Sequence, residues 1–171
     1  MERPSEAEFA PFYARYVALV PEADILAVLE QQVAEIRRLA ASVPPERETF
    51  RYAEGKWSIR EVLGHLVDGE RVFGYRAFCF SRGDPAALPS FDENQYVAAA
   101  RSDATPLPEL ADELALVRRS NLVVLRRLEP AEWARVGTAS GKPVSVRALA
   151  WVMAGHPRHH LQVLRERYGL K

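Results

Sequence analysis

The segment KWSIREVLGHLVDGERVFGYRAFCFS, residues 56–81, carries the clearest helix signals in the chain. Ser58 stands at an N-cap position with Glu61 three residues later, a capping box in which each side chain accepts a hydrogen bond from the other residue's backbone amide. Trp57 and Val62 flank this box at the positions of a hydrophobic staple. Apolar residues then recur at intervals of three and four. The pattern predicts a helix that follows Ser58 and continues to the end of the segment.

Three further segments show the same spacing of apolar residues and predict long helices at about residues 22–41, 108–128 and 145–169. No segment shows sustained alternation of apolar and polar residues, so the sequence predicts an all-α protein. Four long amphipathic helices in a chain of this length favour a four-helix bundle. About 25 residues separate the second helix from the third, far more than is usual in bundles. We therefore expect a long crossover or a lid there, with a short helix near residues 92–101.

Length and composition limit the classes of protein to consider. The chain has 171 residues, of which 48% are apolar and 27% charged, as in ordinary globular domains. We expect a single domain over residues 1–171, with a core bundle at about 22–169 and a leading segment at 1–21. The 23 basic residues balance the 23 acidic ones, which argues against nucleic acid as a partner. No membrane span or signal peptide is visible and Cys79 is the only cysteine, so we expect a cytoplasmic protein.

The chain has four histidines, and three of them lie in HPRHH, residues 156–160. His156 and His160 are four residues apart on the predicted inner face of the last helix, so both can point at one spot. His65 lies on the predicted inner face of the first helix described above. Metal sites in bundle cores are built from inward side chains on facing helices, and imidazole binds zinc, nickel, copper and iron(II). These observations support two interpretations equally: a metal site, and three histidines that are simply packed in the core.

Other polar residues are weaker candidates for a functional site. Asp68, three residues after His65, could accept a hydrogen bond from that ring, although a solvated carboxylate is the commoner role. Arg76 on the same inner face could bind a substrate carboxylate or form a salt bridge. Asn121, the only polar residue on the inner stripe of the third long helix, is a second candidate for substrate binding. His159 points to one side of the other histidines, where it could support them.

Proline and glycine occur at unusual places in the predicted helices. Pro157 lies between His156 and His160 and predicts a kink, because proline removes one backbone hydrogen bond of a helix. Gly64, Gly69 and Gly74 each cost up to about 1 kcal/mol relative to alanine in an exposed helix interior. Glycine at such positions often marks the close approach of another group.

The runs GKWSIREVLGHLVDGERVFGYRAFCFSRGD, LPSFDENQY and SVRALAWVMAGHPRHHLQVLRERYG resemble the DinB-like (DinB/YfiT) four-helix-bundle family. The likeness covers nearly the whole chain from about Val20 onward. It is most specific in the order Trp-Ser, one histidine, a long gap and then HxxxH. The resemblance implies a bundle with a long crossover between helices two and three, and a divalent metal, zinc or nickel, held by three histidines. These fall on His65, His156 and His160, whereas Pro157 stands where the family more often has a helix former.

The resemblance also implies a function. Members of the family include transferases that join a low-molecular-weight thiol, such as bacillithiol or mycothiol, to electrophiles, and a thiol-dependent maleylpyruvate isomerase. Homodimers are common among them. The leading hypothesis is a metal-dependent enzyme for a small-molecule substrate, a thiol S-transferase in detoxification, in which a water or a thiol at the metal is the reacting group. The alternatives are a metal-dependent hydrolase and a non-catalytic bundle that binds a metal or a small ligand.

Overall fold

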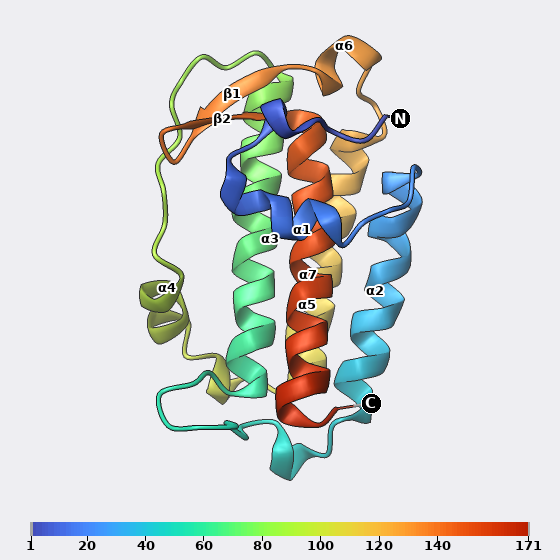
Figure 1. The fold of residues 1–171 in the computed structure, drawn as a ribbon. Helices are drawn as coiled ribbons and strands as arrows, with labels where there is room; N and C mark the ends of the chain where they lie inside the picture. Colours follow the sequence, from blue (N-terminus) through green and yellow to red (C-terminus); the bar gives the residue numbers. More distant parts are fainter. Residues whose placement is uncertain (1, 171) are drawn as a thin grey trace.

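The computed structural model describes residues 2–170 and shows four long helices side by side (Figure 1). They are α2 (Ile25–Ser42), α3 (Ile59–Ser81), α5 (Leu107–Leu125) and α7 (Val146–Tyr168). Apolar side chains of all four helices fill the space between them. This arrangement confirms the predicted four-helix bundle, and each long helix begins and ends within three residues of its predicted limits.

Shorter elements connect the long helices and lie at the ends and on the outside of the bundle (Figure 1). The leading segment contains the 3-10 helices η1 (Glu6–Glu8) and η2 (Pro11–Tyr13) and then α1 (Ala14–Ala18). The other short helices are η3 (Pro45–Arg47), α4 (Glu93–Ala100) and η4 (Ser102–Ala104), of which α4 and η4 lie in the long crossover between α3 and α5. The chain from α5 to α7 contains α6 (Pro130–Trp133), β1 (Val136–Ala139) and β2 (Lys142–Ser145). None of the helices in residues 2–170 has the length and apolar composition of a membrane span.

Local hydrogen bonds fix the ends of the two helices that carry the histidines. The Ser58 hydroxyl accepts from the Glu61 amide at 3.0 Å, and the Ser58 amide donates to the Glu61 carboxylate at 2.8 Å, which confirms the capping box. At the start of α7 the Ser145 hydroxyl accepts from the Ala148 amide at 2.9 Å. Gly169 follows α7 with a φ of 68°, the left-handed conformation that commonly ends a helix.

The all-α prediction missed a small antiparallel sheet formed by β1 and β2. Each strand has only four residues, too few for a visible alternation of apolar and polar side chains. Ser140 and Gly141 connect them with φ values of 54° and 72°, the positive values that a two-residue hairpin turn of type I′ requires. The hairpin lies across one end of α3 (Figure 1), and the Leu88 amide of the crossover donates to the Thr138 carbonyl at 2.9 Å.

A buried ion pair joins the long helices in the interior. Arg118 of α5 has no exposed surface, and its Nε and one terminal nitrogen each donate to one carboxylate oxygen of Glu70 at 2.8 Å. The same guanidinium donates to the Leu29 carbonyl of α2 and to the side-chain oxygen of Gln32, both at 3.1 Å. Such a bidentate, fully hydrogen-bonded pair is the form in which a buried charge is tolerated.

The same network supports α7 at Pro157. A proline has no amide to donate to the carbonyl four residues earlier, so the Met153 carbonyl lacks its helical donor. Arg118 donates to this carbonyl at 2.9 Å, and the Gln32 side chain donates to the next one, of Ala154, at 2.7 Å. The helix is continuous through Pro157 and ends at Tyr168.

Candidate metal centre

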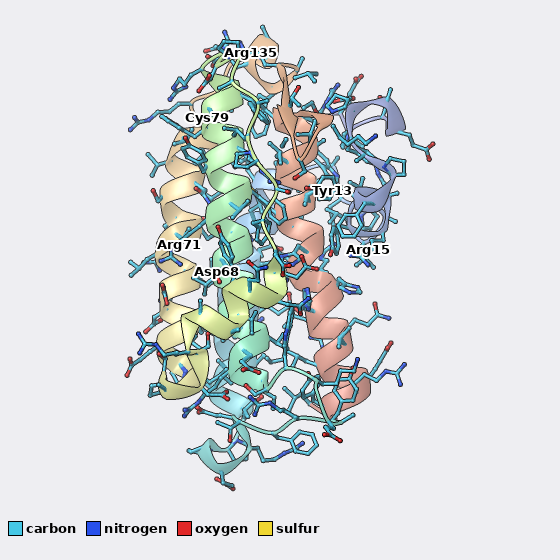
Figure 2. The ribbon with its side chains drawn as sticks, turned by 90° about the vertical axis from the view of Figure 1, so that its left-hand side faces the viewer. Tyr13, Arg15, Asp68, Arg71, Cys79 and Arg135 are labelled. Atoms are coloured by element: carbon cyan, nitrogen blue, oxygen red, sulfur yellow. The ribbon has the colours of Figure 1, made fainter. Side chains whose placement is uncertain are left out.

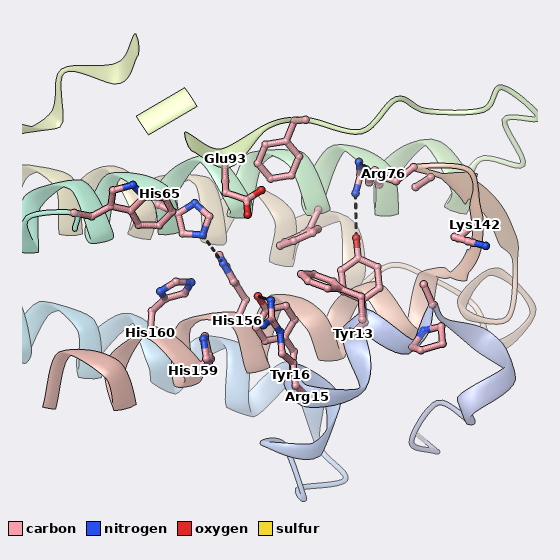
Figure 3. Close-up of a pocket in the computed structure, with 18 residues that line it drawn as sticks. Tyr13, Arg15, Tyr16, His65, Arg76, Glu93, Lys142, His156, His159 and His160 are labelled. Carbon is pink, nitrogen blue, oxygen red and sulfur yellow. Dashed lines mark hydrogen bonds between the residues drawn. The ribbon is translucent and has the colours of Figure 1, made fainter. Parts of the chain in front are cut away.

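Three histidines from two helices converge in the structure (Figure 3). His65 lies on α3, whereas His156 and His160 lie one turn apart on α7. The Nε2 atoms of His65 and His156 are 2.9 Å apart, and one ring nitrogen from each of the three histidines lies within 4.8 Å of the others. The structure thus brings together the three residues that the sequence suggested as ligands.

The absence of a side chain at Gly69 makes room for His156. A Cβ at this position would lie 2.8 Å from the Cε1 atom and 3.0 Å from the Nδ1 atom of the ring. The rings of Tyr16 and Phe73 lie edge-on to the same imidazole, with centroids 5.3 and 5.6 Å away. Packing on several sides therefore fixes the position of His156, and the glycine predicted to mark a close approach does so.

Burial determines the charge of these histidines. It lowers the pKa of His65 to about 4, an effect that the negative charge of Glu93 partly opposes. Burial also lowers the pKa values of His156 and His160 well below the usual value, and the neighbouring imidazoles add to the effect. The three rings are consequently neutral at pH 7, which is the form that binds a metal ion.

The donor set fits a divalent metal. Each neutral imidazole has one nitrogen with a free lone pair. The contact between His65 and His156 uses one of the three lone pairs, and no other hydrogen bond within residues 2–170 reaches the ring nitrogens of the cluster. A metal would bind all three lone pairs and keep at least one coordination position open, as in catalytic sites.

Asp68 does not orient His65 as the sequence had suggested. The Nδ1 atom of His65 is buried and has no hydrogen-bond partner within residues 2–170. Figure 2 shows Asp68 and Arg71 on the side of α3 that faces α5, whereas His65 faces α7. The two residues are about 60° apart around α3, and Asp68 lies among residues of α4, η4 and α5 rather than beside the imidazole.

Asn121 does not reach the histidines either, so its proposed role in substrate binding is corrected. Its side-chain amide donates to the Glu70 carboxylate at 2.8 Å. Gly74 leaves space for this contact, because a Cβ there would lie 2.3 Å from the Asn121 amide nitrogen. Asn121 therefore belongs to the buried network around Arg118.

A cavity of about 450 Å³ opens beside the histidines, between α3, α7, the leading segment and the crossover. Aromatic side chains dominate its wall, including Tyr16, Phe73 and Phe91. Trp57 also lines it and packs against His65, with the ring centroids 4.8 Å apart. A concave site of this volume, mostly apolar with a few polar groups, is typical of small-molecule binding.

Several charged and polar side chains also line this cavity. Arg76 and His159, which the sequence suggested as weak candidates, are among them. Glu93, Arg15 and Lys142 were missed, because they lie in α4, α1 and β2, and only tertiary structure places these elements beside the histidines. The one available signal for Glu93 was its position in an unusually long connection, a kind of segment that often carries function.

The fold matches solved structures at low sequence identity. YfiT from Bacillus subtilis, described as "a probable metal-dependent hydrolase with an unusual four-helix bundle topology", is 17% identical, with a TM-score of 0.74 over 99% of this chain and 95% of that one. A mycothiol-dependent maleylpyruvate isomerase gives a TM-score of 0.66 at 14% identity, over 85% of this chain and 61% of that one. At these identities the likenesses establish the fold alone.

Comparison at the level of sequence identifies the family. Among curated protein sequences, none matches this chain. The family model of the DinB superfamily matches residues 28–164, a range that contains His65, His156 and His160 and most of the bundle. The chain therefore belongs to the DinB superfamily.

Proposed function

We propose that the chain is a metal-dependent enzyme for small molecules, with His65, His156 and His160 as the ligands of one zinc or nickel ion. The observation that carries this proposal is the convergence of three neutral imidazoles on the wall of a cavity of about 450 Å³. A closed structural zinc site would need a fourth protein ligand. Within residues 2–170 no cysteine or carboxylate joins the cluster, which favours a site open to a substrate.

The reaction that we favour is the transfer of a low-molecular-weight thiol to an electrophile, as in detoxification. A bound divalent metal would supply a Lewis acid that lowers the pKa of a thiol. The aromatic walls formed by Tyr16, Phe73 and Phe91 would hold an apolar electrophile, and Glu93 would accept the proton of the thiol. The mycothiol dependence of the structurally similar isomerase supports a thiol as co-substrate.

Hydrolysis is the second candidate, and Glu93 favours it. The Glu93 carboxylate lines the cavity. Burial lowers the pKa of His65 and raises that of Tyr16; the negative charge of Glu93 opposes the first shift and adds to the second. A carboxylate in that position would act as a general base toward a water molecule. The similarity to YfiT, described as a probable metal-dependent hydrolase, supports this reaction.

Turnover assays on zinc- and nickel-loaded protein separate these reactions. Bacillithiol, mycothiol and cysteine would each be paired with a bimane electrophile, and nitrophenyl esters would report hydrolysis. We expect thiol conjugation that falls by about 100-fold in His65→Ala and after chelation, since loss of a ligand removes the metal. Arg119→Met, which alters an exposed residue of α5, is the control that leaves conjugation unchanged.

The other outcomes of these assays are equally informative. Ester hydrolysis without thiol conjugation would replace the transferase by the hydrolase. Bound metal that raises the melting temperature without any turnover would favour a non-catalytic bundle that binds a metal or a small ligand.

We also propose that residues 1–171 form one domain that works as a homodimer in the cytoplasm. Tyr75 and Phe78 of α3 are 60% and 44% exposed and offer an apolar surface for a second subunit. Cys79 is a free buried thiol, which agrees with a reducing compartment. Sedimentation velocity tests the dimer, and a mass of one chain at micromolar concentration would contradict it.

A further inference from the structure

Arg76 is a buried cation without a counter-charge. Only 2% of its surface is exposed, and it lies at the end of the cavity away from the histidines (Figure 3). Its guanidinium donates to the Tyr13 hydroxyl at 3.3 Å, the Pro89 carbonyl at 2.7 Å and the Ser140 hydroxyl at 3.1 Å. All three acceptors are neutral oxygens, and no carboxylate within residues 2–170 forms a salt bridge with Arg76.

Arg118 is a buried arginine with a structural role in the same protein, and its partners differ from those of Arg76. It is as deeply buried as Arg76, and both oxygens of the Glu70 carboxylate accept from it at 2.8 Å. Burying a cation without an anionic partner is costly. Arg76 bears this cost at the wall of a cavity, where a ligand could supply the missing anion.

Three segments far apart in the sequence converge on Arg76. Tyr13 comes from the leading segment, Pro89 from the crossover and Ser140 from the hairpin turn. Ser140 has a φ of 54°, a conformation that residues other than glycine rarely adopt. A guanidinium has five N–H donors, of which these contacts use three. The position of the head group is thus fixed, and donors remain for a ligand.

The charges along the cavity are unbalanced. Lys142 and Arg15 line it together with Arg76, and neither forms a salt bridge within residues 2–170. Glu93 is the one carboxylate among the lining residues of the described chain, and it lies beside the histidines rather than beside Arg76 (Figure 3). The cavity therefore favours an anionic ligand whose negative group lies at the Arg76 end.

We propose that Arg76, assisted by Lys142, binds a carboxylate of the substrate, which makes the substrate an organic acid with an apolar body. This inference rests on the proposed function in one respect, since the reacting end of that acid would face the histidines. His65 and Arg76 are eleven residues apart on α3, so their Cα atoms are separated by about 16 Å along the axis. Both side chains lean toward the start of α3, and the longer Arg76 side chain spans part of that distance.

Binding of a matched acid and amide tests this proposal. The probes are 4-phenylbutyrate and its neutral amide, titrated calorimetrically into the full chain both loaded with zinc and stripped of metal. We expect the acid to bind about tenfold tighter than the amide in both states, because an arginine–carboxylate hydrogen bond is charge-assisted. Arg76→Met should abolish this preference and Arg76→Lys should retain part of it. Arg119→Met, the same change at an exposed site outside the cavity, should leave it unchanged.

Several outcomes would overturn the proposal. Equal binding of acid and amide, absence of acid binding, or a preference that survives in folded Arg76→Met would each refute a carboxylate site at Arg76. A preference present only with zinc would place the carboxylate at the metal and would also refute it. If circular dichroism shows that Arg76→Met is unfolded, Lys142→Met replaces it, with an expected loss of about threefold in the preference. An intact preference without turnover would reject the proposed enzyme and retain the carboxylate site.

Discussion

The substitution Gly69→Ala tests whether the position of His156 determines metal binding. The added Cβ would lie 2.8 Å from Cε1 of His156, whereas carbon atoms in ordinary contact are about 3.5 Å apart. The ring would therefore retreat by about 0.7 Å, more than the tolerance of roughly 0.2 Å on a metal–nitrogen distance. Tyr16 and Phe73 lie edge-on to the ring and restrict this movement.

Two effects of opposite sign follow from this substitution. Alanine is favoured over glycine in a helix interior by up to about 1 kcal/mol. This gain in the free energy of unfolding offsets part of the loss that the clash with His156 causes. Zinc affinity should fall by about tenfold or more, the size of effect found when a ligand loses its orientation. Competition with a chromogenic chelator measures the affinity, and urea denaturation of the metal-free protein measures the stability.

Gly74→Ala is the matched control on the same helix. Its Cβ would meet the side-chain amide of Asn121, outside the histidine cluster, so stability should change while zinc affinity stays constant. Zinc affinity within twofold of the wild type for folded Gly69→Ala would refute the reasoning. In that case the His156 ring would reach its metal-binding position despite the added methyl group.

Three further predictions concern stability. Arg118→Met should lower the free energy of unfolding by about 3–5 kcal/mol in urea denaturation, because it leaves the buried Glu70 carboxylate unpaired; a loss below about 1 kcal/mol would contradict this. The metal-free protein should lose stability as the pH falls from 6.5 to about 4. The unfolded state takes up a proton on His65 in that window and the folded state does not, a contribution of about 3 kcal/mol that a flat pH profile would rule out. Ser58→Ala should lower the free energy of unfolding by about 1 kcal/mol, because it removes the N-cap and the hydrogen bond of the same hydroxyl to Asp103. An unchanged urea midpoint would contradict this prediction.

The long helices and their ends could be predicted because their signals are local. The capping box of Ser58 and Glu61 lies within four consecutive residues, and Ser145 and Gly169 limit α7 in the same direct way. Helical periodicity also placed His65, His156 and His160 on inner faces, and the structure brings these faces together. That they bind a metal stays a prediction.

The residues that were missed or misplaced depend on tertiary contacts. On α5, Arg118 and Leu122 are buried, whereas Asn121, which was predicted on the inner stripe, is only half-buried, a shift of one position. An arginine in a sequence indicates a surface, and only the partner Glu70 on another helix makes its burial possible. Glu93 was missed for a similar reason, because no local pattern places α4 beside the histidines.

The measurement that tests the central claim most directly is the metal content of untagged protein purified without a metal-affinity column. We predict about one zinc or nickel ion per chain in the wild type, as three imidazole ligands and an open position imply. The metal should be lost in His65→Ala, His156→Ala and His160→Ala. It should be retained in His159→Ala, which removes a neighbouring imidazole outside the cluster. Failure of the wild type to take up either metal, or full metal content in His65→Ala, would contradict the account.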